Sequence, residues 1–205
     1  MRMNEQMLIQ FAQQGDLESF NQLVLAYQDL IYTHAVRILG DSHAADDATQ
    51  ECFLSAFRSL ATFRGGSFKA WLLRIITNQC YDELRRQKRH PTSALEPLNA
   101  EDEEIETAQW MVDPSESPED QIAQGALRDA IQRCLDELPE EFRSVVVVVD
   151  MDGCDYAQAA QILSKPIGTI KSRLARARFK MQKCLQGFWE LLPARFRLES
   201  EGKYE

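Results

Sequence analysis

The sequence predicts an all-α protein made of two small helical domains joined by an acidic linker. Apolar residues recur every three or four positions in both halves of the chain, the spacing that gathers side chains on one face of a helix. The alternation of apolar and polar residues that is typical of strands is absent from the first 90 residues. An acidic segment rich in proline separates the two periodic regions, which favours a linker between domains.

The first domain, residues 1–90, is expected to contain three helices. An apolar stripe from Leu17 to Leu39 predicts the first helix. The second is expected to begin near Asp46, and a glycine-rich break at 63–67 separates it from the third. The third is expected over about 68–89.

The linker, residues 91–120, holds ten acidic side chains, no basic ones and four of the seven prolines. Because like charges repel, we expect an extended segment. Composition favours a solvated spacer; the alternative is a strand that occupies a basic channel or mimics nucleic acid. Trp110 and Met111 are exceptions, since an isolated polar spacer has no reason to carry a large apolar pair.

The second domain, residues 121–185, begins with an apolar stripe over 122–138. Five consecutive valines, Val145–Val149, follow, and local propensity would assign them to a strand. No partner strand is in sight, and an isolated strand is not stable. We therefore predict a buried helix over 140–151.

The rest of the second domain has the pattern of a helix-turn-helix. A short helix over 156–163, with Asp155 as its N-cap, is followed by a break at 164–168 and a basic helix over 169–185. Surface helices normally mix acids with bases, so six cations without an acid favour binding to an external polyanion. Ser164 or Thr169 is expected to cap this helix, or else to donate to a phosphate. The cations are Lys171, Arg173, Arg176, Arg178, Lys180 and Lys183.

A second basic cluster spans residues 63–90, with seven basic and two acidic side chains interleaved with aromatic ones. Cations mixed with rings suit single-stranded nucleic acid, whose bases stack on rings while its phosphates meet Lys and Arg. Phe63 and Phe68 flank the glycines and are expected to be exposed, whereas Phe57 and Trp71 are expected in the core. The polar candidates are Arg64, Ser67, Lys69, Arg74, Asn78, Tyr81, Arg85 and Arg86.

A third cluster, DDATQE at 46–51, places Asp47, Gln50 and Glu51 on one helical face. The helix dipole accounts for acids in a first turn, but not for Gln50 or Glu51. The residues alone leave open a protein-docking site or plain solvated surface.

The total charge and the cysteines exclude other classes. A net charge of −9 excludes a uniformly basic coat protein. No run approaches the roughly 18 apolar residues that span a bilayer, and no signal peptide is recognisable, so we expect a cytoplasmic protein without membrane insertion of its own. Five cysteines without a C-x-x-C pair predict no disulfide scaffold, no metal site and no cofactor.

In combination these segments resemble a known family. FNQLVLAYQDLIYTHAVRILGD, DDATQECFLSAF and FRGGSFKAWLLRIITNQCYDELRR precede the linker, and LPEEFRSVVVVVDMDGCDYAQAAQILSKPIGTIKSRLARAR follows it. In this order they resemble bacterial RNA polymerase sigma factors of the extracytoplasmic-function group, over about residues 5–185.

The resemblance implies that the chain recruits core RNA polymerase to promoter DNA, and that an anti-sigma factor regulates it. Asp47, Gln50 and Glu51 would dock on core polymerase. The loop at 63–67 and the helix after it, through Asn78, Tyr81, Arg85 and Arg86, would open and read the minus-ten element. The minus-thirty-five element would be read in the major groove by Thr169, Lys171, Ser172, Arg173, Ala175 and Arg176.

Two departures from the family leave the minus-thirty-five sequence open. Lys171 stands where the family often has Arg, so a point charge replaces a bidentate fork. Ala175 is too small for the bulky contact that some members make there. The C-terminal extension, residues 186–205, is expected to pack on the domain through Phe188 and neighbouring apolar residues, or else to dock a regulator.

Two alternatives remain. A stand-alone helix-turn-helix regulator would bind duplex DNA by itself, but it leaves the first domain's aromatic and basic residues without a use, and no dimerisation element is found. An enzyme is less favoured still, because the sequence has no Walker loop, G-x-S-x-G or zinc-protease motif. Cys80 or Cys154 as a nucleophile is a weak hypothesis beside a buried thiol.

Overall fold

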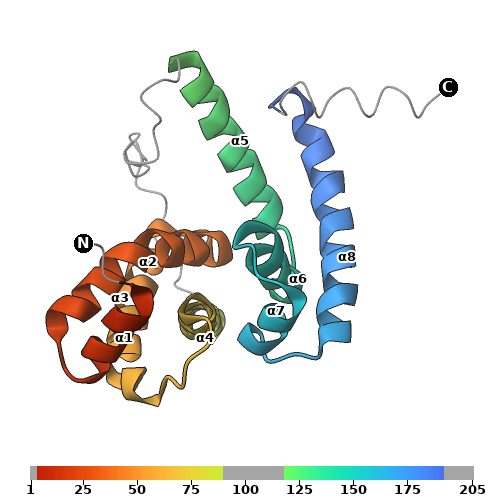
Figure 1. Ribbon diagram of the computed structural model, residues 1–205. Coiled ribbons are helices and arrows are strands. Elements are labelled where there is room, and N and C mark those ends of the chain that lie inside the picture. The colour runs from red at the N-terminus through yellow and green to blue at the C-terminus, as the bar shows by residue number, and fades with distance from the viewer. Residues whose placement is uncertain (1–3, 90–117, 192–205) are drawn as a thin grey trace.

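The computed structural model describes residues 4–89 and 118–191, and within these ranges every regular element is a helix. Figure 1 shows two groups of helices that pack side by side, α1–α4 and α5–α8. The predicted all-α class with two helical domains is therefore confirmed. Trp110 and Met111 lie outside the described residues.

The first domain contains one helix more than the sequence predicted. The additional helix is α1, Glu5–Gln13; α2 spans Leu17–Leu39, α3 Ser42–Ser59 and α4 Phe68–Arg89, with a 3-10 turn, η1, at Leu60–Thr62. Helix α3 begins four residues before Asp46, because the Asp41 carboxylate accepts a hydrogen bond from the Ala44 amide (2.6 Å) and caps the helix there.

The core of the first domain lies where α2, α3 and α4 meet. Leu23 and Ile31 of α2 and Leu72, Leu73 and Ile76 of α4 are each at most 2% exposed. Removing an aliphatic side chain from such a site typically costs about 2–5 kcal/mol. This packing determines which face of α4 is buried in the core and which face stays available for contacts with other molecules.

Two phenylalanines differ in solvent exposure from what the sequence predicted. Phe68 is 1% exposed, because its ring lies at the start of α4 with the Tyr27 and Phe63 rings edge-on at centroid distances of 5.6 and 5.5 Å. Phe57 is 42% exposed and touches the Phe20 ring edge-on. Both stand near helix ends, where the neighbouring elements rather than helical periodicity decide which side is covered.

In the second domain the five valines are helical, as predicted. Val145–Val148 are at most 4% exposed, and the helix widens into a π-helical turn at its end. Asp155 caps the next helix in a reciprocal capping box with Gln158, as expected. The elements are α5 Pro118–Asp136, α6 Glu140–Val146, the π-helix η3 Val147–Met151, α7 Tyr156–Ile162, α8 Ile167–Leu185 and the 3-10 helix η4 Gln186–Leu191.

Neither proposed cap of the basic helix acts as one. Helix α8 begins at Ile167, two residues earlier than expected, with Pro166 at the N-cap position. Thr169 therefore lies inside the first turn, and Ser164 adopts a left-handed backbone conformation (φ 51°) in the preceding turn. Proline pre-sets the backbone at the helix start, and the Pro166 carbonyl accepts the first helical hydrogen bonds, from the Thr169 and Ile170 amides.

Arg143 joins the two domains through backbone carbonyls. This residue of α6 is 9% exposed, and its guanidinium donates to the carbonyl of Ile38 at 2.6 Å and to that of Asp136 at 2.8 Å. The first carbonyl lies at the end of α2, and the second at the end of α5. Helix ends have carbonyls without helical partners, so one cation satisfies two of them.

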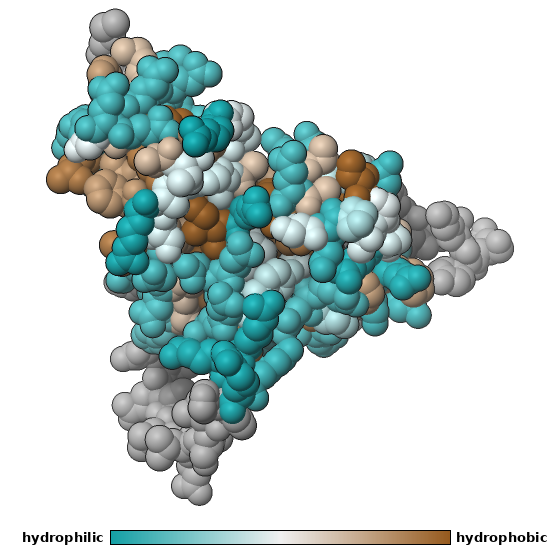
Figure 2. Space-filling view, turned by 90° about the horizontal axis from the view of Figure 1, so that it is seen from below, coloured by the Kyte–Doolittle hydropathy of each residue, from teal (hydrophilic) through white to brown (hydrophobic). Residues whose placement is uncertain are grey.

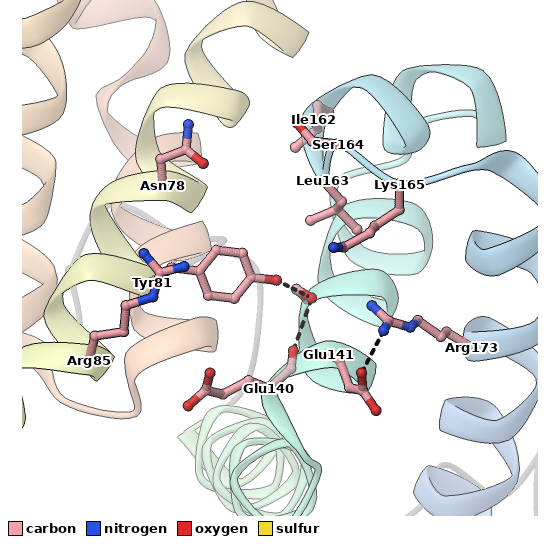
Figure 3. A pocket seen from close by; sticks show the side chains of 11 residues that line it. Asn78, Tyr81, Arg85, Glu140, Glu141, Ile162, Leu163, Ser164, Lys165 and Arg173 are labelled. Carbon is pink, nitrogen blue, oxygen red and sulfur yellow. Dashed lines mark hydrogen bonds and ion pairs between the residues drawn. The ribbon is translucent and has the colours of Figure 1, made fainter. Parts of the chain in front are cut away.

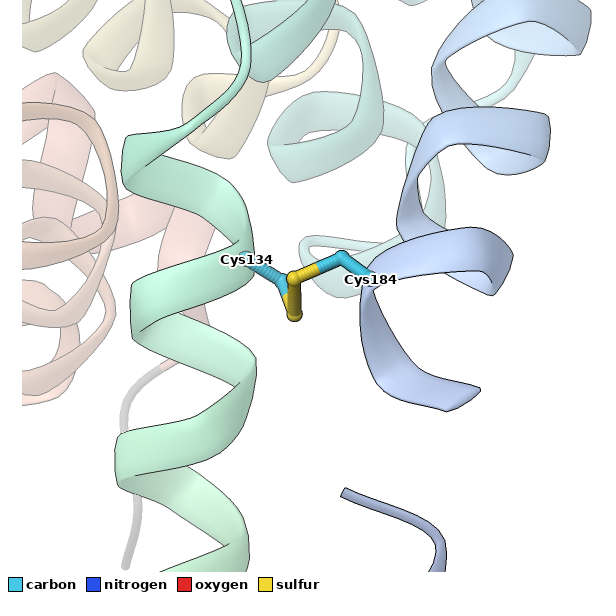
Figure 4. The surroundings of a disulfide bond; sticks show 2 residues. All are labelled: Cys134 and Cys184. Atoms are coloured by element: carbon cyan, nitrogen blue, oxygen red, sulfur yellow. A yellow bond between two sulfur atoms is a disulfide. The ribbon is translucent and has the colours of Figure 1, made fainter. Parts of the chain in front are cut away.

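A single disulfide joins Cys134 of α5 to Cys184 of α8 (Figure 4), although the sequence predicted no disulfide scaffold. The spacing of cysteines along the chain gives no sign of it, because only the packing of α5 against α8 brings the pair together. The other three cysteines are free and buried. Burial raises the pKa of Cys52 and of Cys80 to about 12, so both stay protonated at neutral pH.

The Cys134–Cys184 bond is expected to stabilise the second domain. Under oxidising conditions Cys134→Ser should lower the free energy of unfolding by up to about 4 kcal/mol, because a cross-link across 50 residues restricts the unfolded chain. Denaturant unfolding of wild type with and without reductant measures the effect, and Cys154→Ser, a buried thiol outside the bond, is the control. Identical wild-type curves in both conditions would contradict the prediction.

Candidate nucleic-acid interface

The loop before α4 is shaped by two glycines. Gly65 and Gly66 have φ angles of 96° and 91°, in the left-handed region that other residues rarely adopt. The hydroxyl of Ser67 then accepts a hydrogen bond from the Ala70 amide at 3.1 Å and starts α4. The loop thus turns sharply and leaves Arg64 exposed beside the helix.

Helix α4 presents a row of polar side chains opposite its core face. Arg74, Asn78 and Arg85 are exposed at spacings of four and seven residues, which align them along one side of the helix. Phe68 does not join this row, because it is buried. Phe63 is half-buried against Phe68 and Trp71.

The two arginines at the end of α4 pair with acids of the same helix. Arg85 bonds Asp82 at 2.8 Å, and Arg86 makes a bidentate pair with Glu83 at 2.8 and 3.0 Å. The Arg86 hydrogen bond lowers the pKa of Glu83, and Glu83 in turn raises the pKa of Arg86. Water and salt screen such exposed pairs, so a phosphate can replace the carboxylate at little cost.

A cleft of about 340 Å³ separates this face of α4 from the second domain (Figure 3). Asn78, Tyr81 and Arg85 enter it from α4, and Lys165 and Arg173 face them. Tyr81 crosses the cleft and donates a hydrogen bond to the Ser144 hydroxyl at 2.7 Å. Burial raises the pKa of Tyr81, so the phenol stays protonated and keeps donating at neutral pH.

Two of the six cations of α8 pair with acids of other elements, so the prediction of six cations without acidic partners is wrong. Arg173 pairs with Glu141 at 2.5 Å, and Arg178 makes two bonds to Asp150 at 2.5 and 2.9 Å. Both acids belong to α6 or η3, so a search along α8 alone misses them.

Four cations of α8 form no ion pair within the described ranges: Lys171, Arg176, Lys180 and Lys183. Lys171 stands 5.6 Å from the Tyr156 ring centroid. Ser172 and Ala175 are exposed beside these cations, whereas Thr169 and Arg173 are half-buried. One exposed side of α8 therefore remains positively charged.

The acidic patch on α3 lies on the exposed side of that helix. Asp47, Gln50 and Glu51 are exposed, and Ala48, Cys52 and Ala56 on the opposite side are buried.

Sequence reasoning missed an apolar addition to the α3 patch. Leu54 is 50% exposed one turn beyond Gln50 and Glu51, on the same side. Figure 2 shows a mostly hydrophilic face with a group of hydrophobic side chains at its left edge and smaller ones near its centre and upper right.

A buried polar cluster between the domains was also missed by sequence reasoning. His34 of α2 is fully buried and contacts the Asp152 carboxylate through Nδ1 at 2.7 Å and the Thr77 hydroxyl through Nε2 at 3.0 Å. Lys69 donates to the backbone carbonyl of Asp152. These groups lie far apart along the chain, so no sequence motif indicates that they are in contact.

Two further properties concern the described residues alone. Among them, no helix is long and apolar enough to cross a membrane. No group of three potential metal ligands is found in the same ranges.

Comparison with known families gives two matches in chain order. Residues 23–90 match the family model of sigma-70 region 2, and residues 128–181 match that of sigma-70 region 4. The first match includes the α3 patch and α4; the second includes the helix-turn-helix. The chain thus has the two conserved regions of a sigma factor of RNA polymerase.

Relatives of known function agree with this class. RNA polymerase sigma-H factor of Pseudomonas aeruginosa is 34% identical over 183 residues, covering 89% of this chain and 94% of the relative. The ECF RNA polymerase sigma-E factor of Escherichia coli K12 is 34% identical over 179 residues, covering 86% and 92%. The chain belongs to the extracytoplasmic-function (ECF) sigma factors, and it directs promoter-specific initiation of transcription by RNA polymerase.

Solved structures agree on the fold. The sigma factor RpoE of Bartonella quintana, in complex with the anti-sigma factor NepR, has a TM-score of 0.61 at 23% identity, covering 82% of this chain and 98% of that one. CnrH, in complex with the cytosolic domain of CnrY, has a TM-score of 0.60 at 24% identity, covering 89% and 97%. The matches to sigma-70 regions 2 and 4 and the sigma-factor relatives do not favour the stand-alone regulator.

Proposed function

We propose that the two domains recognise different promoter elements, each through its own charged surface. Residues 1–90 dock on core polymerase and open the minus-ten element, and residues 121–185 read the minus-thirty-five element. Residues 91–120 connect them as an acidic linker, and residues 186–205 are an extension. The observation that carries this proposal is that each domain keeps an exposed basic helical face, on α4 and on α8, opposite its own core.

The α4 face suits single-stranded DNA. Arg64, Arg74, Arg85 and Arg86 supply cations for phosphates, while Asn78 supplies an amide for a base edge. Lys69 and Tyr81 reach the same side once they leave their partners in the second domain. Capturing a flipped base costs a few kcal/mol, which these contacts must recover.

Burial changes the part that the aromatic residues take in this proposal. Phe68 supports the loop from within, since a ring that is 1% exposed cannot stack on a base. Phe63, which is half-buried on Phe68, together with Ser67 shapes the loop surface that meets the strand.

The α8 face suits duplex DNA in the major groove. Lys171, Ser172, Ala175 and Arg176 are exposed near the helix N-terminus, where recognition helices contact base edges. Thr169 and Arg173 lie beside them, and we assign phosphate contacts to both. A lysine at 171 contacts guanine as a point charge, so discrimination there is weaker than with arginine.

The α3 patch suits a protein partner. Asp47, Gln50 and Glu51 offer hydrogen-bond acceptors next to Leu54, a mixture of polar and apolar groups that is common in protein interfaces. We assign this patch to core polymerase. Polymerase carries out the chemistry, and the chain itself acts in the cytoplasm without catalytic activity of its own.

An anti-sigma factor is the proposed regulator. A sigma factor of the same fold, RpoE, is known in complex with the anti-sigma factor NepR. A partner that covered α4 or the α3 patch would block DNA or polymerase.

Reconstitution tests the proposed function directly. Core RNA polymerase is mixed with this chain and a library of genomic promoter fragments, and run-off transcripts are sequenced. We expect transcripts that share a minus-ten and a minus-thirty-five sequence. Tight footprints by the chain alone, without transcripts from the mixture, would instead support the stand-alone regulator.

Charge reversal on α3 is expected to weaken binding to core polymerase. Asp47→Lys with Glu51→Lys should raise the dissociation constant at least tenfold, because like charges then meet the docking surface. Fluorescence anisotropy of labelled protein with core polymerase measures it. Asp129→Lys with Glu137→Lys makes the same charge change on exposed residues of the second domain and is the control. Equal affinities for both double variants would refute the assignment.

Removal of one α8 cation tests the minus-thirty-five assignment. Arg176→Ala should cost about 1–3 kcal/mol of binding at promoters that require this element, since a base or phosphate contact is lost. Arg178→Ala is the matched control, because Asp150 already holds that guanidinium. Abortive initiation on promoters with and without the element gives the comparison, and an equal loss on both promoters would count against the assignment.

A further inference from the structure

Helix α1 carries one side chain that reaches the start of the glycine loop before α4. The amide nitrogen of Gln13, the last residue of α1, donates to the carbonyl of Leu60 at 3.0 Å and to that of Phe63 at 3.0 Å. A glutamine amide nitrogen carries two hydrogens, so these two bonds use its whole donor capacity. Gln13 thus joins the first helix to a segment that lies 47 to 50 residues further along the chain.

The two carbonyls stand where the helical backbone ends and the loop begins. Leu60 is the first residue of the 3-10 turn η1, and Phe63 directly follows that turn. The Phe63 amide donates to the Leu60 carbonyl at 3.0 Å, whereas no backbone amide in the described ranges donates to the Phe63 carbonyl. The ends of helices leave such carbonyls without a partner. Gln13 supplies the partner at the first residue of the loop.

The tip of the loop is open, so its shape depends on how its two ends are held. A Cβ added at Gly65 or at Gly66 would meet no neighbouring atom within 4 Å, and a glycine backbone has much conformational freedom to lose. At the far end, the Ser67 hydroxyl accepts a hydrogen bond from the first turn of α4. At the near end, the half-buried Phe63 ring and the two bonds from Gln13 hold the backbone.

Helix α1 is itself anchored, so Gln13 extends from a fixed base. Leu8 and Ala12 of α1 are at most 8% exposed, and the Tyr27 hydroxyl of α2 donates to the Glu5 carboxylate at the start of α1. The Gln13 side chain lies on the exposed side of the helix and adds no apolar area to this core. Exposed polar side chains usually contribute little to stability. The two bonds of Gln13 therefore act on the loop more than on the core.

We propose that Gln13 is a positioning residue for minus-ten recognition, which holds the start of the loop at 63–67 in the shape that meets the single strand. Gln13 does not touch the DNA and acts through the backbone of Phe63, next to Arg64. The proposal rests on the assignment of this loop to the minus-ten element. A loop that is ordered before binding loses less entropy on contact with DNA, so more of its contact energy remains for discrimination between bases.

Three substitutions at Gln13 separate the hydrogen bonds from packing. Gln13→Glu keeps the size but places a carboxylate, which cannot donate, against two carbonyl oxygens. Gln13→Met keeps the size without a donor or a charge. Gln13→Lys restores N–H donors at the end of a long stem. Gln14→Glu is the matched control, because it adds the same charge at the next exposed residue, whose side chain has no hydrogen-bond partner among the described residues.

The readout is base discrimination by core polymerase reconstituted with each variant of the full chain. Run-off transcription compares the promoter found by reconstitution with promoters altered at one base of the minus-ten or of the minus-thirty-five element. Gln13→Glu and Gln13→Met should lower minus-ten discrimination about fivefold, because two hydrogen bonds that order the loop are lost. Minus-thirty-five discrimination and affinity for core polymerase should match wild type. Gln13→Lys should recover about half of the lost discrimination.

Unchanged minus-ten discrimination in both Gln13→Glu and Gln13→Met overturns the positioning role. An equal loss at both promoter elements, or no recovery in Gln13→Lys, overturns it too, because either result marks a general effect on folding. A loss in Gln14→Glu as large as that in Gln13→Glu would assign the effect to charge instead of the two hydrogen bonds. Wild-type initiation that ignores the minus-ten sequence refutes the proposed function itself, whereas wild-type dependence with unaffected variants refutes only the role of Gln13.

Discussion

Helix α4 has to satisfy two requirements with the same 22 residues. One face supplies Leu72, Leu73 and Ile76 to the core of the first domain, and the opposite face carries Arg74, Asn78 and Arg85. Because a helix advances 100° per residue, fixing the apolar face by packing fixes the polar face as well. The position of the DNA surface is therefore a consequence of how the core of α2, α3 and α4 packs.

The same coupling explains why sequence patterns predicted so much of the fold. Helical periodicity predicted α2 and α4 together with their first and last residues. For the five valines, the lack of a partner strand favoured a helix despite their β propensity. The acidic patch of α3 and most of the basic row of α4 also follow from periodicity, because their exposure is the complement of the core.

What the sequence did not predict depends on contacts between distant segments. Phe68 is buried because α2 and the glycine loop meet at its ring, and Arg173 finds its acid on another helix. Cys134 and Cys184 are 50 residues apart, and His34 and Asp152 are 118 apart. No local rule of spacing relates such pairs, since only the packed fold brings them together.

The disulfide also has a mechanical consequence. Helix α5 is the first element after the linker, and Cys134 near its end is bonded to Cys184 at the end of α8. A pull on α5 from its N-terminal side is therefore transmitted through a covalent bond to the far end of the basic helix. In the oxidised protein, tension between the domains would be borne by the whole second domain as one body, without peeling its first helix away.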